Sequence, residues 1–209
     1  MSVNGDKIRQ RYDRLAPWFD GLEGFLEGLI FRRLRKKLWA MAEGQHILEV
    51  GVGTGKNFNF YPPRARMTAI DFSPKMLEQA ERIRESKQLD ILLDLIDVQS
   101  LCYADISFDT VVASFVFCSV PRPRKGLKEI YRVLKPGGQL LLLEHVLSSN
   151  KFMAAVMNCD IHLTDQLAVY KREVDKLGLK TVAPCVNASL ASFTVRDGAI
   201  VYGLGALKN

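Results

Sequence analysis

The sequence predicts an α/β fold built on a doubly wound, mostly parallel sheet, and three observations indicate it. From residue 46 onward, short apolar runs alternate with helical patterns, which is typical of strand–helix–strand units. Acidic residues stand at or near the ends of the first three runs, and the first run leads into a turn with glycine at every second position. A later run, Gln139–Glu144, is almost purely apolar, as expected for a strand buried on both faces.

Five strands and their connecting helices follow from this pattern. The strands are expected at His46–Val50, Met67–Ile70, Ile91–Leu95, Thr110–Phe117 and Gln139–Glu144. Between them, Ser73 caps a helix that starts at Pro74, and a helix over Leu127–Leu134 is stopped by the turn-forming residues 135–138. After Val146 we expect a helical region over 151–177 and two strands, near 180–186 and 199–207.

The first 42 residues are expected to be helical. One helix spans Asn4–Ala16 and ends at Pro17. The next segment, Gly21–Ala42, is either two helices with a bend near Ile30 or one helix with an apolar half followed by a cationic half. Its basic residues are Arg32, Arg33, Arg35, Lys36 and Lys37. We therefore expect residues 1–42 to form an N-terminal helical lid and candidate membrane-docking segment, and residues 43–209 to form the main domain.

The basic run has two interpretations. Cations beside an apolar helical stretch suit docking at an anionic membrane surface, where arginine and lysine meet phosphates. Alternatively, the helices pack on the domain and their basic exterior is simply solvated. A third partner, nucleic acid, is attracted by such runs as well, but the expected end of the fourth strand, Ser114–Phe117, lacks an Asn-Pro-Pro-Tyr type base-flipping motif. We therefore expect no nucleic-acid partner.

Length and composition fit one globular domain with at most a small appendage. The chain has 209 residues, of which 48% are hydrophobic and 25% charged, with a net charge of +6. The four cysteines are widely spaced, so we expect reduced, mostly buried thiols and neither a disulfide framework nor a metal site. A polar N-terminus and the lack of an apolar run of ~18 residues favour a cytoplasmic protein, soluble or peripheral to a membrane. We expect a monomer.

The stretch Ile47–Asn57 carries the most specific motif. Gly51, Gly53 and Gly55 allow positive φ and leave no Cβ where a ligand would approach, and a helix is expected directly after them. A phosphate loop would need Ser or Thr after Lys56, where Asn57 stands. The dinucleotide fingerprint would need Gly or Ala in place of Lys56 itself, three residues after Gly53. The remaining pattern, acid-x-Gly-x-Gly-x-Gly from Glu49, resembles the first motif of class I S-adenosylmethionine-dependent methyltransferases. A tight turn without a ligand is the alternative.

Two further acids are placed for a nucleoside. Asp71 ends the second strand twenty residues after Gly51, where an acid can accept hydrogen bonds from both ribose hydroxyls. Asp97 follows the third strand and can receive the adenine amino group, with a backbone N–H from Val98. Phe72 and Met76 could sandwich the adenine ring. Each acid has a plainer interpretation, Asp71 as a strand-end turn residue and Asp97 as an Asx-turn.

The resemblance extends from Tyr12 to about Ser148 and identifies the chain with the Methyltransf-11 type shared by quinone methyltransferases, bacterial phospholipid N-methyltransferases and animal thiol methyltransferases. It is carried by Ile47–Gly55, Ala69–Met76, Ser107–Asp109, Leu127–Gly138 and Leu143–Val146. It implies a seven-stranded Rossmann-like sheet with an antiparallel C-terminal strand, and S-adenosylmethionine as cofactor, released as S-adenosylhomocysteine. The implied cofactor-binding residues are Glu49 (reaching the methionine ammonium through water), Gly51, Gly53, Asp71, Asp97, Ser114 and Phe115. The residue pattern itself adds Gly55, Phe72, Met76 and Val98.

The N-terminal stretch Tyr12–Asp20 resembles a lead-in that folds over the cofactor in quinone and phospholipid methyltransferases. Tyr12 and both aspartates match, but Phe19 replaces a tyrosine of the family pattern, so its hydroxyl is absent. Tyr12 would close over the methyl group. At the end of the fifth strand, His145 would take a proton from the acceptor and Glu144 would orient it or bind a cationic headgroup.

The stretches Asn59–Pro63 and Val116–Val120 recur in the phospholipid and thiol branches. The sequence hypothesis is therefore a methyltransferase that N-methylates phosphatidylethanolamine at the inner membrane surface. A thiol or quinone methyltransferase is the alternative within the class. A nucleic-acid-binding protein and a non-catalytic cofactor-binding scaffold are the alternatives outside it.

Overall fold

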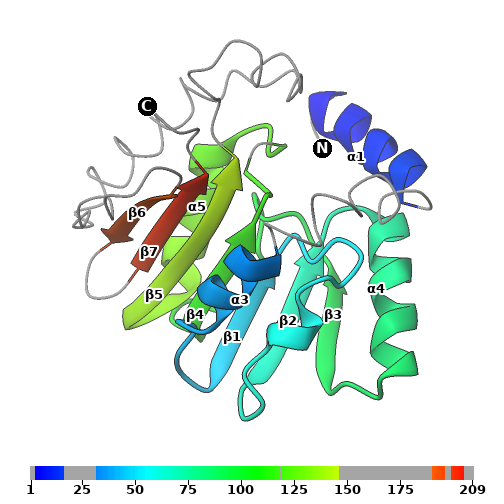
Figure 1. Ribbon diagram of the computed structural model, residues 1–209. Helices are drawn as coiled ribbons and strands as arrows, with labels where there is room; N and C mark the ends of the chain where they lie inside the picture. The colour runs from blue at the N-terminus through cyan, green and yellow to red at the C-terminus, as the bar shows by residue number, and fades with distance from the viewer. Residues whose placement is uncertain (1–2, 17–31, 118, 146–189, 196–198, 205–209) are drawn as a thin grey trace, which may run out of the picture.

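The computed structural model describes residues 3–16, 32–117, 119–145, 190–195 and 199–204. Its centre is a sheet of five parallel strands in the order β3-β2-β1-β4-β5 (Figure 1). The strands are β1 (His46–Val50), β2 (Arg66–Asp71), β3 (Ile91–Leu95), β4 (Phe108–Ser114) and β5 (Leu134–His145). The chain builds outward from β1 to β3 and then returns to β4, so the strand order reverses between β1 and β4. Ligands of doubly wound sheets bind at the carboxyl ends of the strands, beside such a reversal.

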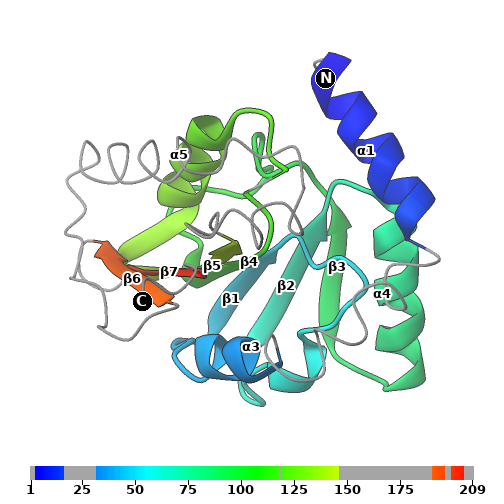
Figure 2. The ribbon, with the colours of Figure 1, turned by 45° about the horizontal axis from the view of Figure 1, so that its top comes forward.

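Helices cover both faces of this sheet, and the alternation of side chains along β1 shows how. Ile47 packs in a core with Leu38 and Trp39 of α3 (Arg32–Trp39), and Ala80 of α4 (Pro74–Ser86) belongs to the same core. Leu48 and Val50 point to the opposite face, where they pack with residues of α5 (Pro123–Val133). Figures 1 and 2 show α3 and α5 on opposite sides of the sheet. Trp39 is only 2% exposed, so α3 is an integral part of the core.

The first helix, α1 (Val3–Leu15), agrees with the expected helix over Asn4–Ala16. It lies beside the start of α4, at the end of the molecule toward which the parallel strands point (Figure 2). Asp13 holds it there, because its Oδ1 accepts hydrogen bonds from Ser73 Oγ at 2.7 Å and from the Lys75 N–H at 3.3 Å. The rest of the lead-in, 17–20, and the apolar half of the next segment, 21–31, lie outside the described residues.

The helix expected directly after the glycine turn is not present. Residues 53–57 form turns, followed by a short 3₁₀ segment, η2 (Phe58–Phe60). Two local causes are visible. The Asn57 side chain makes no capping bond because it is used inside the protein, and Pro62 and Pro63 lack the N–H groups that a continuing helix would need.

Other boundaries also differ from the expectation. α5 begins at Pro123, ahead of the expected start at Leu127. β4 ends at Ser114 because Phe115 has φ of 59°, outside the strand conformation. β5 begins at Leu134, and the expected turn at 135–138 is a bulge within it: Phe108 pairs with Leu134, whereas Thr110 pairs with Gln139.

Two short strands lie next to β5 near the C-terminus, β6 (Leu190–Val195) and β7 (Ala199–Leu204). β7 pairs parallel to β5, and β6 pairs antiparallel to β7. This pairing does not confirm an antiparallel final strand, and the seven-stranded sheet stays a prediction. The helical region at 151–177 and the strand near 180–186 lie outside the described residues.

Two expectations from composition can be compared with the structure. Cys102 is exposed and unpaired, and because Cys118, Cys159 and Cys185 lie outside the described residues, the expectation of mostly buried thiols stays a prediction. None of the helices in the described ranges is long and apolar enough to cross a bilayer.

Candidate active site

A cavity of about 500 Å³ opens at the carboxyl ends of β1, β2 and β3, which is within the usual size of small-molecule sites. Its wall continues through the loop after β4 to the start of α5, and α1 contributes Arg9. Five residues that the sequence assigns to a cofactor line it together: Gly51, Asp71, Phe72, Asp97 and Val98.

The glycine turn meets this cavity at Gly51, and its three glycines differ in what surrounds them. All three have positive φ, between 56° and 84°. A Cβ on Gly51 would lie 2.4 Å from a methyl carbon of Val116, and one on Gly55 would lie 2.6 Å from the Phe58 ring. A Cβ on Gly53 would meet nothing within 4 Å. Gly51 and Gly55 therefore serve close packing, whereas Gly53 leaves open space beside the turn.

Asp71 joins the turn to the end of β2. Its Oδ2 accepts the Gly53 N–H at 2.9 Å, and its Oδ1 accepts the Ser73 N–H at 2.9 Å. The side chain is 6% exposed. Burial raises the pKa of Asp71 to about 6, against these backbone hydrogen bonds, which lower it. Each carboxylate oxygen keeps acceptor capacity for a ligand that enters the cavity.

Asp97 forms the Asx-turn that the sequence offered as its plainer interpretation, and its predicted contact with adenine stays a prediction. Its Oδ1 accepts the Gln99 N–H at 2.9 Å, which is an Asx-turn, and the Gln99 side-chain amide also bonds to both carboxylate oxygens. Asp97 nevertheless lines the cavity next to Val98. The side-chain oxygen of Gln99, Oε1, accepts the Arg122 N–H at 3.0 Å. This bond links the segment after β3 to the start of α5.

Glu49 lies outside the cavity lining, in a closed polar cluster on the α3 face of the sheet. It is 0% exposed, and it points to the same face as Ile47 because side chains alternate along the strand. Asn57 Nδ2 donates to its Oε1, and the Tyr61 hydroxyl donates to its Oε2. Burial raises the pKa of Glu49 to about 7, while these two bonds and the nearby Arg35 charge lower it.

Arg35 enters this cluster from α3. Its Nη1 donates to Asn57 Oδ1 and to Ser114 Oγ, both at 3.1 Å, and the guanidinium lies 5.0 Å from the centre of the Phe115 ring. The side chain is 6% exposed. The prediction that Arg35 binds a membrane is therefore wrong. A run of basic residues in the sequence does not show which of its side chains point to solvent. Arg35 lies on the buried face of α3 with Leu38 and Trp39.

Comparison with known proteins supplies the identity of the fold. Residues 48–142 match the family model described as a methyltransferase domain. A phosphatidylethanolamine N-methyltransferase from Cereibacter sphaeroides is 37% identical over 155 residues, which cover 72% of this chain and 74% of that protein. The chain belongs to this methyltransferase family.

Two further comparisons agree with that assignment. A rat protein named thiol S-methyltransferase TMT1B is 43% identical over 103 residues, but the match spans only 48% of this chain and 42% of that protein. Among solved structures, a Methanococcus maripaludis protein described as an S-adenosyl-L-methionine-dependent methyltransferase superposes with a TM-score of 0.66, 16% identity and 94% coverage of both chains. At that identity the likeness concerns the fold.

The protein is thus an S-adenosylmethionine-dependent methyltransferase, and S-adenosylmethionine is its cofactor. The residues present fit this group. The cavity is large enough for an adenosyl moiety, Asp71 and Asp97 offer acceptors at neighbouring strand ends, and Gly53 leaves room beside the turn. When bound, the cofactor supplies an activated methyl group on a sulfonium, and the protein positions the acceptor against it.

Some of the predicted site residues lie at or beside the cavity and others do not. Phe72 lines the cavity and packs edge to face against Tyr12, with ring centres 5.9 Å apart. Tyr12 therefore lies beside the cavity, as the resemblance of the lead-in implies for a residue that covers the cofactor. Met76 is 2% exposed and does not line the cavity, so its predicted contact with adenine is not found. Ser114 and Phe115 are brought to the Arg35 cluster instead.

The structure describes only the backbone of the predicted acid–base pair. Glu144 and His145 are the last residues of β5, paired with Gly203 and Leu204 of β7. Their side chains lie outside the description, so their catalytic roles stay predictions.

Sequence reasoning missed three residues of the site. Asn57 and Tyr61 bond to Glu49, and Asp13 anchors α1 beside the cavity. The signal for Asp13 was its place next to Tyr12 in the family lead-in. Tyr61 lies in the stretch Asn59–Pro63, which recurs in related branches, but that resemblance gave it no partner. Asn57 had no comparable signal, because its role depends on turns that replace the expected helix.

Proposed function

We propose that this methyltransferase N-methylates phosphatidylethanolamine and its methylated intermediates at a membrane surface. The observation that carries the proposal is the 37% identity, over nearly three quarters of both chains, to a protein named phosphatidylethanolamine N-methyltransferase. In the reaction, the amine lone pair forms the N–CH₃ bond while the S–CH₃ bond breaks, and the sulfonium becomes the thioether of S-adenosylhomocysteine. An acceptor that arrives as an ammonium ion must first lose a proton.

The predicted residues have the following roles in this proposal. His145 takes the ammonium proton, and Glu144 orients His145 or binds the cationic headgroup. Tyr12 closes over the methyl group from α1. Residues 1–42 act as a lid and docking segment on the main domain at 43–209, and the protein works as a monomer on the cytoplasmic side of the membrane.

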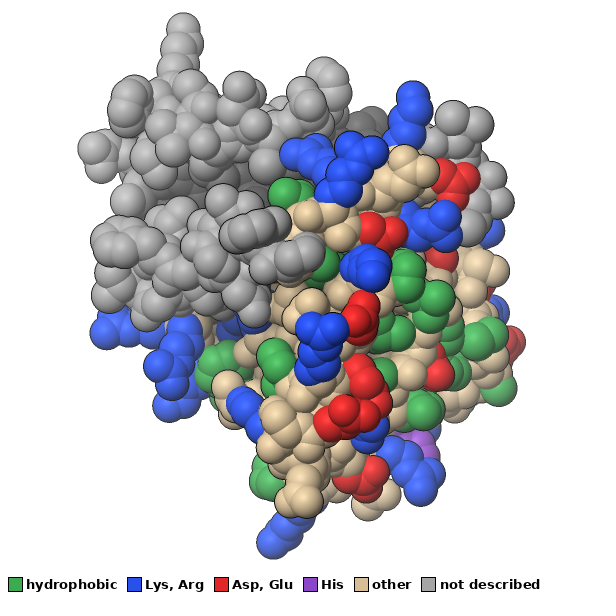
Figure 3. Space-filling view, turned by 90° about the vertical axis from the view of Figure 1, so that its right-hand side faces the viewer, with side chains coloured by type: hydrophobic (Ala, Val, Ile, Leu, Met, Phe, Trp, Pro, Cys, Tyr) green, Lys and Arg blue, Asp and Glu red, His purple; other side chains and the backbone are tan. Residues whose placement is uncertain are grey.

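Exposed cations support the membrane part of the proposal. Arg32, Arg33, Lys36 and Lys37 are exposed on α3. A second group, Arg9, Arg122 and Lys125, lines the cavity itself, and Figure 3 shows Lys and Arg side chains gathered at the upper end of the molecule, near α1. Each basic residue close to an anionic leaflet contributes about 1 kcal/mol of attraction.

One experiment tests the acceptor. Phosphatidylethanolamine vesicles are incubated with the protein and methyl-labelled S-adenosylmethionine, and the lipids are analysed by mass spectrometry. We expect mono-, di- and trimethylated headgroups. A parallel reaction receives a soluble thiol and no lipid. Product in the thiol reaction alone would refute the lipid proposal and would establish thiol S-methylation, the second candidate, which the 43% identity to the rat thiol enzyme favours.

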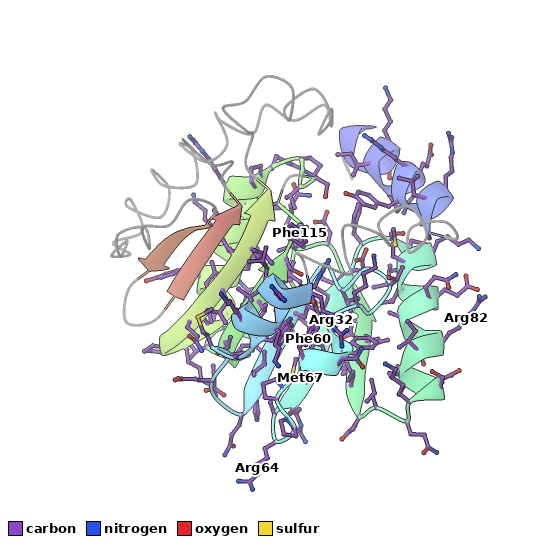
Figure 4. The ribbon with its side chains drawn as sticks, viewed as in Figure 1. Arg32, Phe60, Arg64, Met67, Arg82 and Phe115 are labelled. Carbon is purple, nitrogen blue, oxygen red and sulfur yellow. The ribbon has the colours of Figure 1, made fainter. Side chains whose placement is uncertain are left out.

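A flotation assay tests the surface. The triple variant R33A/K36A/K37A should bind vesicles containing anionic lipid about 100-fold more weakly than the unchanged protein, since three lost cations remove about 3 kcal/mol in all. The control is R64A/R82A, which removes two exposed arginines that do not belong to α3, one at the lower end of the molecule and one on the outer side of α4 (Figure 4). Equal binding of the triple variant and the unchanged protein would contradict docking through α3.

A further inference from the structure

The buried polar cluster beside the glycine turn connects three separate parts of the fold through Arg35. The guanidinium of Arg35, from α3, donates to the side chain of Asn57, at the end of the turn, and to Ser114, the last residue of β4. Asn57 in turn donates to Glu49 of β1 and, at 2.9 Å, to Ser114. β1 and β4 are the strands between which the sheet order reverses.

The donor and acceptor chemistry of this cluster permits one orientation of Asn57. Its Oδ1 must face Arg35, because a guanidinium only donates, and its amide nitrogen then faces the Glu49 carboxylate, which accepts when ionised. Without Arg35, the Asn57 carbonyl would have no charged donor to hold it, and the amide could turn over. Arg35 therefore fixes the orientation of Asn57.

Ser114 is fixed in the same way. Its Oγ accepts from Arg35 Nη1 and from Asn57 Nδ2. Both contacts use the lone pairs of the hydroxyl, so its hydrogen must point away from the two donors. The Ser114 hydroxyl is thereby held as a donor at the carboxyl end of β4, the edge of the sheet at which cofactors bind in this class of fold.

We propose that Arg35 is a positioning residue for S-adenosylmethionine: it holds the Asn57 amide and the Ser114 hydroxyl, and through them the glycine turn and the end of β4, in the conformation that binds the cofactor. The inference rests on the methyltransferase activity and not on a lipid acceptor. It also gives α3 an internal function that is separate from its exposed cations.

A charge effect accompanies the geometry. Among the described residues, the charged or titratable groups that face Glu49 are Arg35 from α3, Tyr61 from the segment after η2, and Asp71 from β2. Of these, Arg35 is the cation that favours ionised Glu49, and Asp71 opposes ionisation. An ionised Glu49, although outside the cavity lining, attracts the cationic methionine end of the cofactor through its charge and without direct contact. Loss of the Arg35 charge should therefore make cofactor binding require a higher pH.

Two variants separate the charge of Arg35 from its hydrogen bonds. R35Q keeps a side-chain donor without the charge, and R35K keeps the charge with a single nitrogen. The matched control is R64M, in which an exposed arginine at the opposite end of the molecule from α1 is replaced (Figure 4). The affinity for S-adenosylhomocysteine is measured by calorimetry between about pH 6 and about pH 9, a range that spans the titration of a carboxyl with a raised pKa, so no methyl acceptor is needed.

We expect R35Q to bind S-adenosylhomocysteine about tenfold more weakly than the unchanged protein near neutral pH, as for loss of a charged hydrogen bond. This deficit should shrink as the pH rises. R35K should be a few-fold weaker with an unchanged pH profile, and R64M should match the unchanged protein. An R35Q affinity equal to that of the unchanged protein, or a deficit of the same size at every pH, would overturn the proposal.

A milder variant covers the case in which R35Q does not fold. S114A removes only the hydroxyl that Arg35 and Asn57 hold, so the Arg35 charge stays in place. It should weaken S-adenosylhomocysteine binding several-fold without moving the pH profile, and in turnover it should raise the KM for S-adenosylmethionine more than it lowers kcat. Unchanged affinity in S114A would refute the role of the β4 end.

Discussion

Two buried acids at neighbouring strand ends, Asp71 and Glu49, are held in opposite ways. Asp71 accepts from two backbone N–H groups, those of Gly53 and Ser73, and it lines the cavity. Glu49 accepts from two side chains, Asn57 and Tyr61, and it lies outside the cavity lining. Burial raises the pKa of both carboxyls, to about 6 for Asp71 and about 7 for Glu49.

The difference indicates a division of labour. Backbone donors are present in every chain that forms the glycine turn, so the position of Asp71 depends on the fold alone. The position of Glu49 depends on side chains from different elements, and a single substitution can disturb it. We therefore expect Asp71 to contribute most to cofactor affinity and the Glu49 cluster to adjust that affinity.

The largest effect is expected for Asp71→Asn. The amide cannot accept from both backbone donors and also from a ribose hydroxyl through each oxygen. The affinity for S-adenosylhomocysteine should fall about 100-fold, as for loss of a charged hydrogen-bond pair, measured by calorimetry. Asp94→Asn is the control, since Asp94 lies on the adjacent strand β3 and bonds to Tyr103. A loss below about threefold would mean that Asp71 supports only the turn.

A smaller effect on affinity, about tenfold, is expected for Glu49→Gln, together with a change in the pH dependence of stability. The folded protein holds the Glu49 proton up to about pH 7, whereas the unfolded chain loses it near 4.5. Between these pH values the folded state binds more protons than the unfolded state. The free energy of unfolding therefore falls by up to about 3 kcal/mol as the pH rises through this range. Glutamine does not titrate, so this decrease should be absent.

Denaturant unfolding of the ligand-free protein and of E49Q at several pH values measures the effect. The difference in unfolding free energy should move in favour of E49Q from pH 4.5 to about 7 and stay constant above. A difference that is constant across this window would show that Glu49 does not titrate there.

The smallest effect is expected for Tyr61→Phe, which removes one of the two donors to Glu49 and keeps the ring against Trp39 and Phe58. Cofactor affinity should fall about threefold and stability by about 1–2 kcal/mol. Tyr103→Phe is the matched control, since its hydroxyl also bonds to an acid, Asp94, at 2.8 Å. The control should lose similar stability and no affinity. Equal losses of cofactor affinity in Tyr61→Phe and Tyr103→Phe would show that the hydrogen bond to Glu49 has no specific effect on cofactor binding.

The sequence predicts the Asp71 side of this comparison well and the Glu49 side poorly, for a physical reason. Asp71, Gly51 and Asp97 stand at strand ends, and parallel strands bring their carboxyl ends together whatever the loops do. Asn57, Tyr61 and Arg35 meet Glu49 only because the chain after Gly55 forms turns and because α3 packs on that face. A hydrophobic pattern predicts that a helix is amphipathic, but it does not predict which surface of the sheet the helix will cover.

The hydrogen bond from the Gly53 amide to Asp71 makes a single nucleus a sensor of the site. The Gly53 nitrogen lies 2.9 Å from Asp71 Oδ2, which belongs to a carboxyl group with a pKa of about 6. The NMR resonance of the Gly53 amide proton should therefore follow the protonation of Asp71 directly. A ligand that engages the carboxylate should move the same resonance, so cofactor occupancy can be followed in a spectrum before any methyl acceptor is known.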